Sequence, residues 1–223
     1  MARRTRAEAL LTRSRILDAA ECVFHDKGVA HASLEDIAAS AKVTRGAIYW
    51  HFKDKAELFE AMMQRVELPV EGMLERAECG THADPLGLLR RASLDVLLRT
   101  ARDPRVQRIF EIAYHKCEYV GDAVGVRDRH IASQQQCLNT IEAGFRACVK
   151  CGQLPKSVNP RVAAIGALSL VSGLIASWVL APESFSLERH AEALVDAYFR
   201  GLACAPAESA RAAPRLSAVR SPK

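Results

Sequence analysis

Apolar residues recur every three or four positions along most of this chain, which is the spacing of α-helices that bury one face. The first stretch of this kind predicts a helix over residues 9–27, ended by Gly28 as a left-handed cap. Its apolar stripe consists of Ile16, Leu17, Ala20, Val23 and Phe24. By the same criterion we expect helices over residues 33–41, 45–52, 54–68, 85–100, 106–119, 122–150, 161–181 and 186–202.

The helix that starts at residue 54 is interrupted by Pro69, so it should kink or end near residues 66–68. Only 6% of the 223 residues are aromatic, and runs of β-branched residues are scarce. The fold class is therefore predicted to be all-α. With 49% hydrophobic residues, the chain can form one large domain, or a small one and a medium one, around a sizeable core.

Two short helices joined by a tight turn stand out in residues 33–52. Ser33 followed by Asp36 has the pattern of a capping box at the start of the first helix. Thr44 is the N-cap candidate of the second helix, where Ile48 and Phe52 share the buried side. Together the two helices have the pattern of a helix-turn-helix.

The other side of the second helix shows Arg45, Gly46, Tyr49, Trp50 and His51 to solvent. These are flat or donor-bearing groups, and a helix of this size fits the DNA major groove. The alternative is an ordinary helical hairpin whose aromatic residues pack in its core. Charge favours the DNA interpretation, because residues 1–15 hold five arginines against one glutamate, a net charge of +4 in a chain of net +5.

TetR-family repressors have a DNA-binding domain that three segments of this chain closely resemble: RSRILDAAECVFHDKG (13–28), LEDIAASAKV (34–43) and TRGAIYWHFKDKAEL (44–58). The resemblance extends over about residues 10–65. The basic start, HKCE (115–118) and GQLP (152–155) resemble the AcrR-type branch, which controls multidrug efflux pumps. This resemblance implies a cytoplasmic, homodimeric repressor of an efflux operon that binds double-stranded operator DNA and is released from it by a lipophilic inducer, such as a drug, an antibiotic or a plant or aromatic compound.

The resemblance also implies a domain plan and a DNA-facing surface. We expect a basic arm over residues 1–8, a DNA-binding domain of three helices over 9–53, a larger helical ligand-binding and dimerisation domain over 54–203, and a disordered tail over 204–223. The helix from residue 54 would connect the two domains. The DNA-facing residues would be Ser33, Thr44, Arg45, Gly46, Tyr49, Trp50, His51 and Lys55.

Within that surface Arg45 is the candidate for reading a base, because a guanidinium pairs with two acceptors of guanine. Thr44, Tyr49, His51 and Lys55 would hold phosphates, which fix register without reading sequence. Activation instead of repression is left open, because both use the same DNA-reading helix.

Drug-sized ligand sites are mostly apolar with a few polar groups, and several central helices expose mixed faces of this kind. In AcrR-type repressors the corresponding helices surround a multidrug pocket. The expected ligand-binding residues are Val66, Leu89, Ser93, Val96, Phe110, Tyr114, Cys137, Ile141, Leu168, Val171, Ser172 and Ile175. The alternative for each of them is a plain role in the core.

Residues 163–181 carry no charge and meet the length rule for a membrane span. Glycines and serines dilute the segment, however, and a helix that is apolar all round suits a protein core or a subunit interface equally well. We therefore expect no membrane. The family resemblance places this helix and the one after it in a four-helix dimer interface.

Catalytic motifs are missing from the sequence, which has no P-loop, GxGxxG, GxSxG or HExxH pattern, so an enzyme is not expected. His115 and Glu118 make a poor metal site, and neither a metal nor a cofactor is expected. The seven cysteines follow no signal peptide and are expected to be reduced. The alternative function is a redox-responsive regulator with Cys148/Cys151 or Cys117/Cys137 as its sensor.

Overall fold

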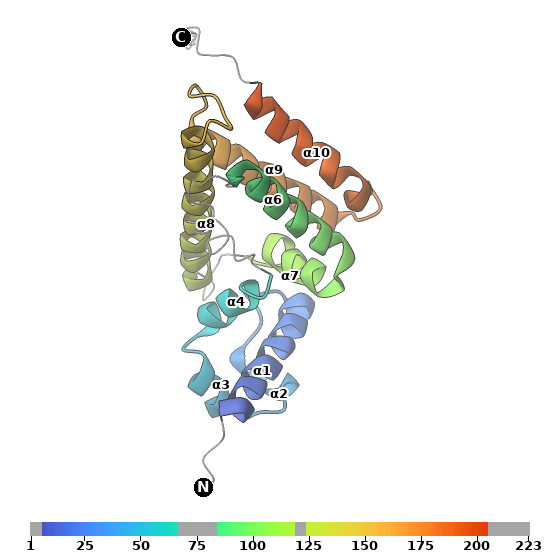
Figure 1. Cartoon of the computed structure of the whole chain (residues 1–223). Coiled ribbons are helices and arrows are strands. Elements are labelled where there is room, and N and C mark those ends of the chain that lie inside the picture. The colour runs from blue at the N-terminus through green and yellow to red at the C-terminus, as the bar shows by residue number, and fades with distance from the viewer. Residues whose placement is uncertain (1–5, 67–83, 119–123, 205–223) are drawn as a thin grey trace, which may run out of the picture.

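A computed structural model describes residues 6–66, 84–118 and 124–204, and within these ranges all regular secondary structure is helical (Figure 1). The all-α prediction is confirmed. The helices are α1 (Arg6–Lys27), α2 (Leu34–Ser40), α3 (Arg45–His51), α4 (Lys55–Met63), α6 (Pro85–Arg102), α7 (Pro104–His115), α8 (Val124–Lys150), α9 (Pro160–Leu180) and α10 (Leu187–Ala203).

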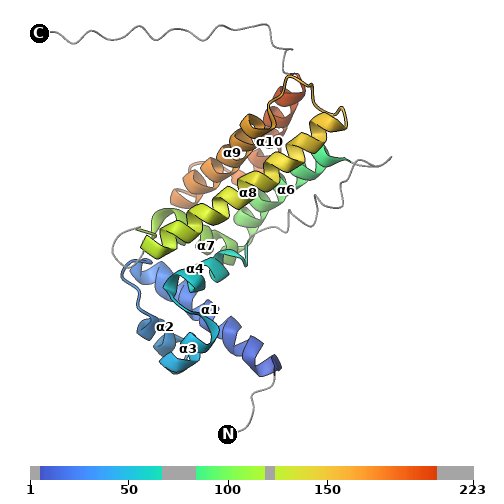
Figure 2. The same cartoon turned by 90° about the vertical axis from the view of Figure 1, so that its left-hand side faces the viewer.

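The helices form two groups along an elongated molecule. Helices α1, α2 and α3 lie together at one end, and α6, α8, α9 and α10 form a bundle towards the other end (Figures 1 and 2). Helix α8 packs along α9, and α6 packs along α10. Helix α4 contacts both α1 and α8, and α7 contacts both α1 and α9, so these two helices join the groups.

Local capping explains most helix boundaries. Gly28 follows α1 with a φ of 76°, a backbone conformation that glycine adopts without strain. A side chain there would also press on the Lys116 carbonyl, because an added Cβ would lie 3.3 Å from that oxygen. Asp103 serves two helices: its backbone N–H closes α6, and its carboxylate accepts from the Arg105 N–H at 2.8 Å to start α7.

Several predicted boundaries need correction. Helix α1 starts at Arg6 instead of residue 9, because Arg6, Ala7 and Glu8 are good helix formers and none of them breaks a helix. Helix α7 ends at His115, short of residue 119, because the Lys116 carbonyl leaves the helix and accepts from the Val29 N–H at 2.8 Å. Helix α4 ends at Met63. The expectations for Pro69, for the N-terminal arm up to residue 5 and for the tail from residue 205 lie outside the described residues.

Helix α9 is long and apolar enough to cross a membrane by length and composition. In this fold one side of it packs against α6, α7 and α8, with Ala163, Ala164 and Ile175 buried. The opposite side is solvent-exposed in the single chain and includes Val162, Ile165 and Leu180. The helix therefore has one core face and one uncovered apolar face.

Candidate nucleic-acid interface and regulatory core

The turn between α2 and α3 is built by local contacts. The Ser33 hydroxyl accepts from the Asp36 N–H at 3.1 Å, and the Asp36 carboxylate accepts from the Ser33 N–H at 3.1 Å, which completes the predicted capping box. Lys42 takes a left-handed φ of 53° in the turn. Thr44 then caps α3 by accepting from the Ala47 N–H at 3.2 Å. The two helices are therefore held at a defined angle before any partner binds.

Helix α3 buries one side and shows the other to solvent, as the sequence predicted. Ile48 is 0% exposed, whereas Tyr49 is 47% and Trp50 72% exposed. Arg45 and Gly46 are exposed on the same surface, and an added Cβ at Gly46 would find its nearest neighbour 3.9 Å away. A large aromatic group left this exposed is unusual for a folded domain and indicates a surface made for contact.

Arg45 is held by two neighbours. Its Nη1 lies 2.5 Å from Glu35 Oε1 on α2, and its Nη2 donates to the Tyr49 hydroxyl at 3.1 Å. The guanidinium also lies over the Tyr49 ring, 5.4 Å from its centroid. The pKa of Arg45 is raised, first by the Tyr49 hydrogen bond and then by the Glu35 charge. Sequence reasoning missed Glu35, and its only signal was an acidic residue in the first turn of α2.

Two predicted DNA-facing residues have structural contacts. Lys55 is half-buried, and its ammonium donates to the carbonyls of Ala30 and Ala32 at 3.0 and 3.1 Å. These bonds tie α4 to the segment between α1 and α2. Ser33 is half-buried in its capping box, and its hydroxyl also donates to Asp36 Oδ2 at 2.8 Å.

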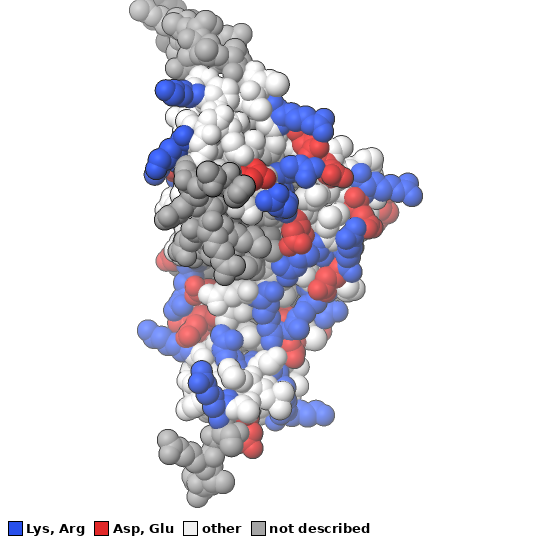
Figure 3. Space-filling view, in the orientation of Figure 1, with Lys and Arg blue, Asp and Glu red and all other residues white. Residues whose placement is uncertain are grey.

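Two arginines of α1 contact the helix-turn-helix, one at the end of α2 and one at the end of α3. Arg15 Nη2 donates to the Ala41 carbonyl at 2.8 Å, which satisfies a backbone acceptor at the end of α2. The Arg13 guanidinium lies 5.0 Å from the centroid of the Phe52 ring. In Figure 3 the end of the molecule that carries α1–α3 shows mainly Lys and Arg among its charged groups, whereas both signs alternate over α6, α7 and α10.

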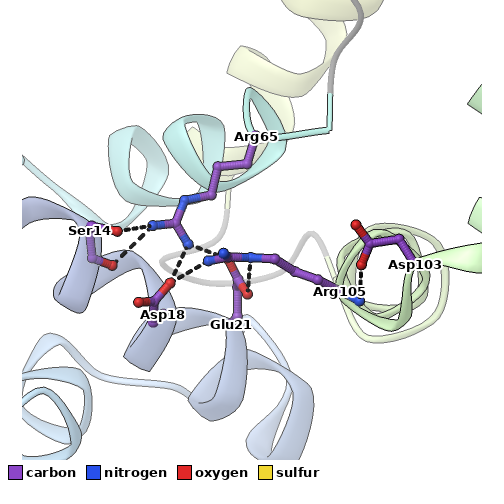
Figure 4. Close-up of polar contacts among 6 residues, drawn as sticks. All are labelled: Ser14, Asp18, Glu21, Arg65, Asp103 and Arg105. Carbon is purple, nitrogen blue, oxygen red and sulfur yellow. Dashed lines mark hydrogen bonds and ion pairs between the residues drawn. The ribbon is translucent and has the colours of Figure 1, made fainter. Parts of the chain in front are cut away.

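A cluster of charged side chains joins α1, the end of α4 and the start of α7 (Figure 4). Its centre is Glu21 on α1, which is 3% exposed and bonds to Arg65 and to Arg105. Arg105 Nε lies 3.0 Å from Glu21 Oε2, and Arg65 Nη1 lies 2.8 Å from Asp18 Oδ1. The hydrogen bond to Glu21 is the main cause that raises the pKa of Arg105. We call Asp18, Glu21, Arg65 and Arg105 the joint cluster.

The joint cluster was not predicted, although a signal existed. Glu21 follows Ala20 and lies four residues after Leu17, on the apolar stripe of α1. A carboxylate at such a position is rarely buried unless it is paired. The sequence could thus have indicated that Glu21 needs cationic partners, but not that they come from residues 65 and 105.

Part of the predicted ligand-binding set comes together around Tyr114. Phe110 and Tyr114 stack with ring centroids 6.2 Å apart, as their shared helix face predicted. Burial raises the pKa of Tyr114, while a hydrogen bond with Ser172 lowers it and the nearby Cys137 raises it further. Residues of α7, α8 and α9 therefore meet at one phenol group.

Other members of that set are core residues or are already bonded. Val66, Leu89 and Ile175 are buried, and Val96, Ile141 and Val171 pack against the core. The Ser93 hydroxyl donates to the Leu89 carbonyl of its own helix at 2.9 Å. Surface cavities bounded by described residues have volumes of about 350 Å³, beside Trp178 and Phe185, and about 320 Å³, beside Leu10 and Arg65, and neither is lined by the predicted set.

The cysteine pairs named in the redox alternative, Cys148/Cys151 and Cys117/Cys137, are not joined by disulfides. Cys148 is a buried free thiol, and burial raises its pKa to about 12. Such a thiol is a poor nucleophile at neutral pH. Cys151 is disulfide-bonded, so the expectation of reduced thiols is wrong at this position, and it is not bonded to Cys148. Cys148 points into the core from α8 whereas Cys151 lies in the turn that follows. Cys117 and Cys137 also carry thiols that take part in no disulfide.

Across the three described ranges, no group of three or more His, Cys, Asp or Glu side chains is placed to hold a metal ion. His115, considered in the sequence as a metal ligand, has its Nε2 2.8 Å from the Ala176 carbonyl. This contact connects α7 to α9.

A capped helix-turn-helix with an exposed basic and aromatic face, mounted on a larger helical domain, defines the class of DNA-binding transcriptional regulators. Residues 16–62 match the family described as bacterial regulatory proteins, tetR family, and residues 84–204 match the MAATS-type transcriptional repressor C-terminal region. The chain belongs to the TetR family of transcriptional regulators, in its AcrR-type branch, as the resemblance predicted.

The chain is similar to known transcriptional regulators over nearly their whole length. The chain is 39% identical over 207 residues to the HTH-type transcriptional regulator TtgR of Pseudomonas putida, covering 93% of this chain and 99% of TtgR. NalD, the secondary repressor of the MexAB-OprM multidrug efflux pump of Pseudomonas aeruginosa, is 36% identical with a TM-score of 0.78, covering 88% of this chain and 98% of NalD. SmeT of Stenotrophomonas maltophilia, in a complex with triclosan, is 32% identical with a TM-score of 0.76, covering 86% of this chain and 91% of SmeT.

Proposed function

We propose that this protein is a ligand-responsive repressor of a multidrug efflux operon, and that α3 reads its operator DNA. The observation that carries the proposal is the surface of α3, where Arg45, Tyr49 and Trp50 stay exposed on a helix whose opposite side is fully buried. The names of NalD and SmeT, repressors of efflux pumps, support the choice of operon. Because it must reach DNA, the protein is cytoplasmic.

On DNA, Arg45 reads a base at the floor of the major groove and Gly46 lets the backbone approach closely. Thr44, Tyr49, Trp50 and His51 border the same surface and contact the phosphates and sugars that set register. Ser33 lies at the start of α2, within reach of the backbone. Lys55 contributes its charge near the duplex while its ammonium stays bonded to backbone carbonyls.

The ligand site lies among α6, α7, α8 and α9, with Phe110 and Tyr114 at its centre. Stacked aromatic rings offer apolar area, and the Tyr114 hydroxyl with Ser172 offers a polar group to orient a lipophilic molecule. A solved structure of SmeT is a complex with triclosan, which supports a ligand of this size and chemistry.

The signal passes to DNA through α4. Arg129 on α8 contacts Glu60 of α4 at 3.1 Å and Asp54, the N-cap of α4, at 3.5 Å. Asp54 follows Phe52, the C-cap of α3, by two residues, so a shift of α8 moves α4 and the reading helix together. A ligand releases DNA only as far as it prefers the shifted state, typically by about 1–3 kcal/mol of coupling.

Dimerisation uses the uncovered faces of α9 and α10. Exposed Val162, Ile165 and Leu180 on α9 and Leu194 on α10 form an apolar surface with small residues between them. A two-fold axis through this surface places two reading helices on one operator, roughly 34–36 Å apart. The domain division is therefore DNA binding over residues 9–53 and ligand binding with dimerisation over residues 54–203.

The first test is a binding assay on DNA upstream of the protein's own gene, at fixed salt, with wild type and Arg45→Ala. We expect specific binding by wild type and a loss of about 5- to 150-fold in the variant, the cost of one bidentate base contact. If wild type does not distinguish this DNA from random duplex, a genome-wide selection of bound DNA fragments tests whether the protein prefers a sequence elsewhere. Absence of any preferred sequence there would overturn the proposal.

The ligand part has its own test, in which the wild-type complex with operator is titrated with a panel of lipophilic drugs that includes triclosan. Operator affinity should fall about 5- to 150-fold with an active compound. Tyr114→Phe, which keeps the ring and removes the hydroxyl, should weaken the response while leaving affinity for DNA unchanged. Unchanged operator affinity across the whole panel would contradict ligand control.

A further inference from the structure

Glu35 is an acidic residue on the DNA-facing side of the helix-turn-helix. It lies in the first turn of α2 and forms an ion pair with Arg45 at the start of α3, with 2.5 Å between Oε1 and Nη1. Both side chains are more than half exposed. A carboxylate at this place repels DNA phosphates, so its presence needs an explanation other than affinity.

The contacts of Arg45 supply that explanation. Glu35 occupies Nη1, and the Tyr49 hydroxyl occupies Nη2. These two nitrogens form the fork with which a guanidinium contacts guanine or a phosphate. Each of these nitrogens carries two N–H groups, so a bidentate partner that approaches this edge competes with the Glu35 carboxylate for Nη1 and with the Tyr49 hydroxyl for Nη2.

We infer that Glu35 is a specificity-determining residue that holds Arg45 away from non-operator DNA. This inference rests on the proposed function, in which Arg45 reads an operator base. At the operator, guanine offers two acceptors in the plane of the guanidinium, and these replace the carboxylate. On random DNA the replacement is a single mobile phosphate, which does not compensate for the lost ion pair.

The expected size follows from the kind of interaction. Exposed ion pairs change equilibria by roughly 1.4- to 5-fold, and the repulsion of phosphates by the carboxylate acts in the same direction. Glu35→Gln should therefore bind random duplex about two- to fivefold more tightly than wild type. Its operator affinity should change less, so the ratio of the two affinities falls.

The salt dependence gives a second readout. Once released, Arg45 contacts one more phosphate on random DNA, and the slope of log affinity against log salt should steepen by about 1. A change in protein stability would not produce this steepening. Fluorescence anisotropy with labelled operator and random duplexes at several salt concentrations measures both the ratio and the slope.

Three control variants separate pairing from net charge. Glu35→Asp keeps the charge but shortens the side chain by one methylene, so the ratio should fall although the charge is unchanged. Asp26→Asn makes the same charge change as Glu35→Gln at the far end of α1, and its ratio should equal that of wild type. In an Arg45→Ala background, Glu35→Gln should leave the ratio unchanged.

The outcomes are distinguishable. Equal ratios for wild type and Glu35→Gln, with wild type still specific for its operator, would overturn the role of Glu35 alone. A fall that persists in the Arg45→Ala background would also overturn it, because the effect would then not pass through Arg45. A wild type without any operator preference would overturn this inference and the proposed function together.

Discussion

The Asp36 carboxylate accepts from three donor groups of two residues, and all of them favour its charged form. Lys27 Nζ donates to its Oδ1 at 2.7 Å, and the Ser33 hydroxyl and backbone N–H donate to its Oδ2. These bonds, with Lys27 as the largest cause, lower the pKa of Asp36 from 3.8 to about 2. Because the folded-state pKa is depressed, the resulting stabilisation is complete above pH 4 and is lost as the pH falls towards 2.

The first prediction concerns this carboxyl. Ser33→Ala removes the hydroxyl bond and the N-cap of α2, so the pKa of Asp36 should rise but stay below 3.8, because Lys27 still donates. The free energy of unfolding at pH 7 should fall by about 1 kcal/mol, the usual cost of losing an N-cap. Carbon-detected NMR titration and urea unfolding measure the two effects.

Ser40→Ala is the matched control, since Ser40 is an exposed serine at the other end of the same helix. It should change neither the pKa of Asp36 nor the stability by a measurable amount. If both variants gave the same pKa as wild type, the bond from Ser33 would not contribute to the charged form.

At the scale of helices, the joint cluster determines how the DNA-binding end meets the rest of the protein. Glu21 is buried on α1 and its cationic partners come from the segment after α4 and from the start of α7. A second connection lies nearby, where Lys116 donates from Nζ to the His25 carbonyl at 3.0 Å and accepts from Val29 through its own carbonyl. Helix α1 is thus bonded to both ends of α7, to Arg105 at its start and to Lys116, its C-cap.

The second prediction is that Glu21→Ala lowers the free energy of unfolding by about 3 kcal/mol, because two guanidinium groups lose the buried carboxylate that neutralises them. Asp18→Ala removes an exposed carboxylate of the same cluster and should cost less than about 1 kcal/mol. Urea denaturation with comparable slopes for all three proteins measures the difference. Equal losses for both variants would mean that burial of Glu21 adds nothing.

At the scale of the whole molecule, the uncovered side of α9 and α10 carries several exposed apolar side chains, namely Val162, Ile165, Leu180 and Leu194. Charges of both signs alternate over the neighbouring faces of α6 and α10, where Arg90 pairs with Glu192 and Asp196. Those charged faces are well solvated when they are exposed to water. The contrast between the two kinds of surface supports an interface between two copies of the chain.

The third prediction rests on the proposed dimer: Ile165→Glu should give a monomer, because a carboxylate in that apolar interface would be desolvated without a partner. Operator affinity should then fall by at least about tenfold, since one reading helix replaces two. Light scattering after size exclusion gives the mass. Ile131→Glu, at an exposed apolar residue of α8, is the control and should remain dimeric.

Much of the fold could be predicted because its signals are local. Helix stripes, the Ser33 and Thr44 caps and the Gly28 stop depend on residues within four positions of one another, and all of them are present. The exposed face of α3 followed from the same periodicity. Predictions were wrong at the start of α1 and the end of α7, and at α7 the Lys116 carbonyl pairs with Val29, a residue 87 positions earlier.

By itself, the sequence determined the all-α class, the capped helix-turn-helix, the exposed face of α3 and the family, because each depends on local spacing or on a contiguous motif. Only the tertiary structure decided that Glu35 holds Arg45, that Lys55 donates to backbone carbonyls, that Glu21 joins Arg65 and Arg105, and that Cys148 is a buried thiol apart from Cys151. Most of these contacts join segments that lie far apart in the chain. Their geometry depends on how whole helices pack, and no short-range pattern of residues encodes it.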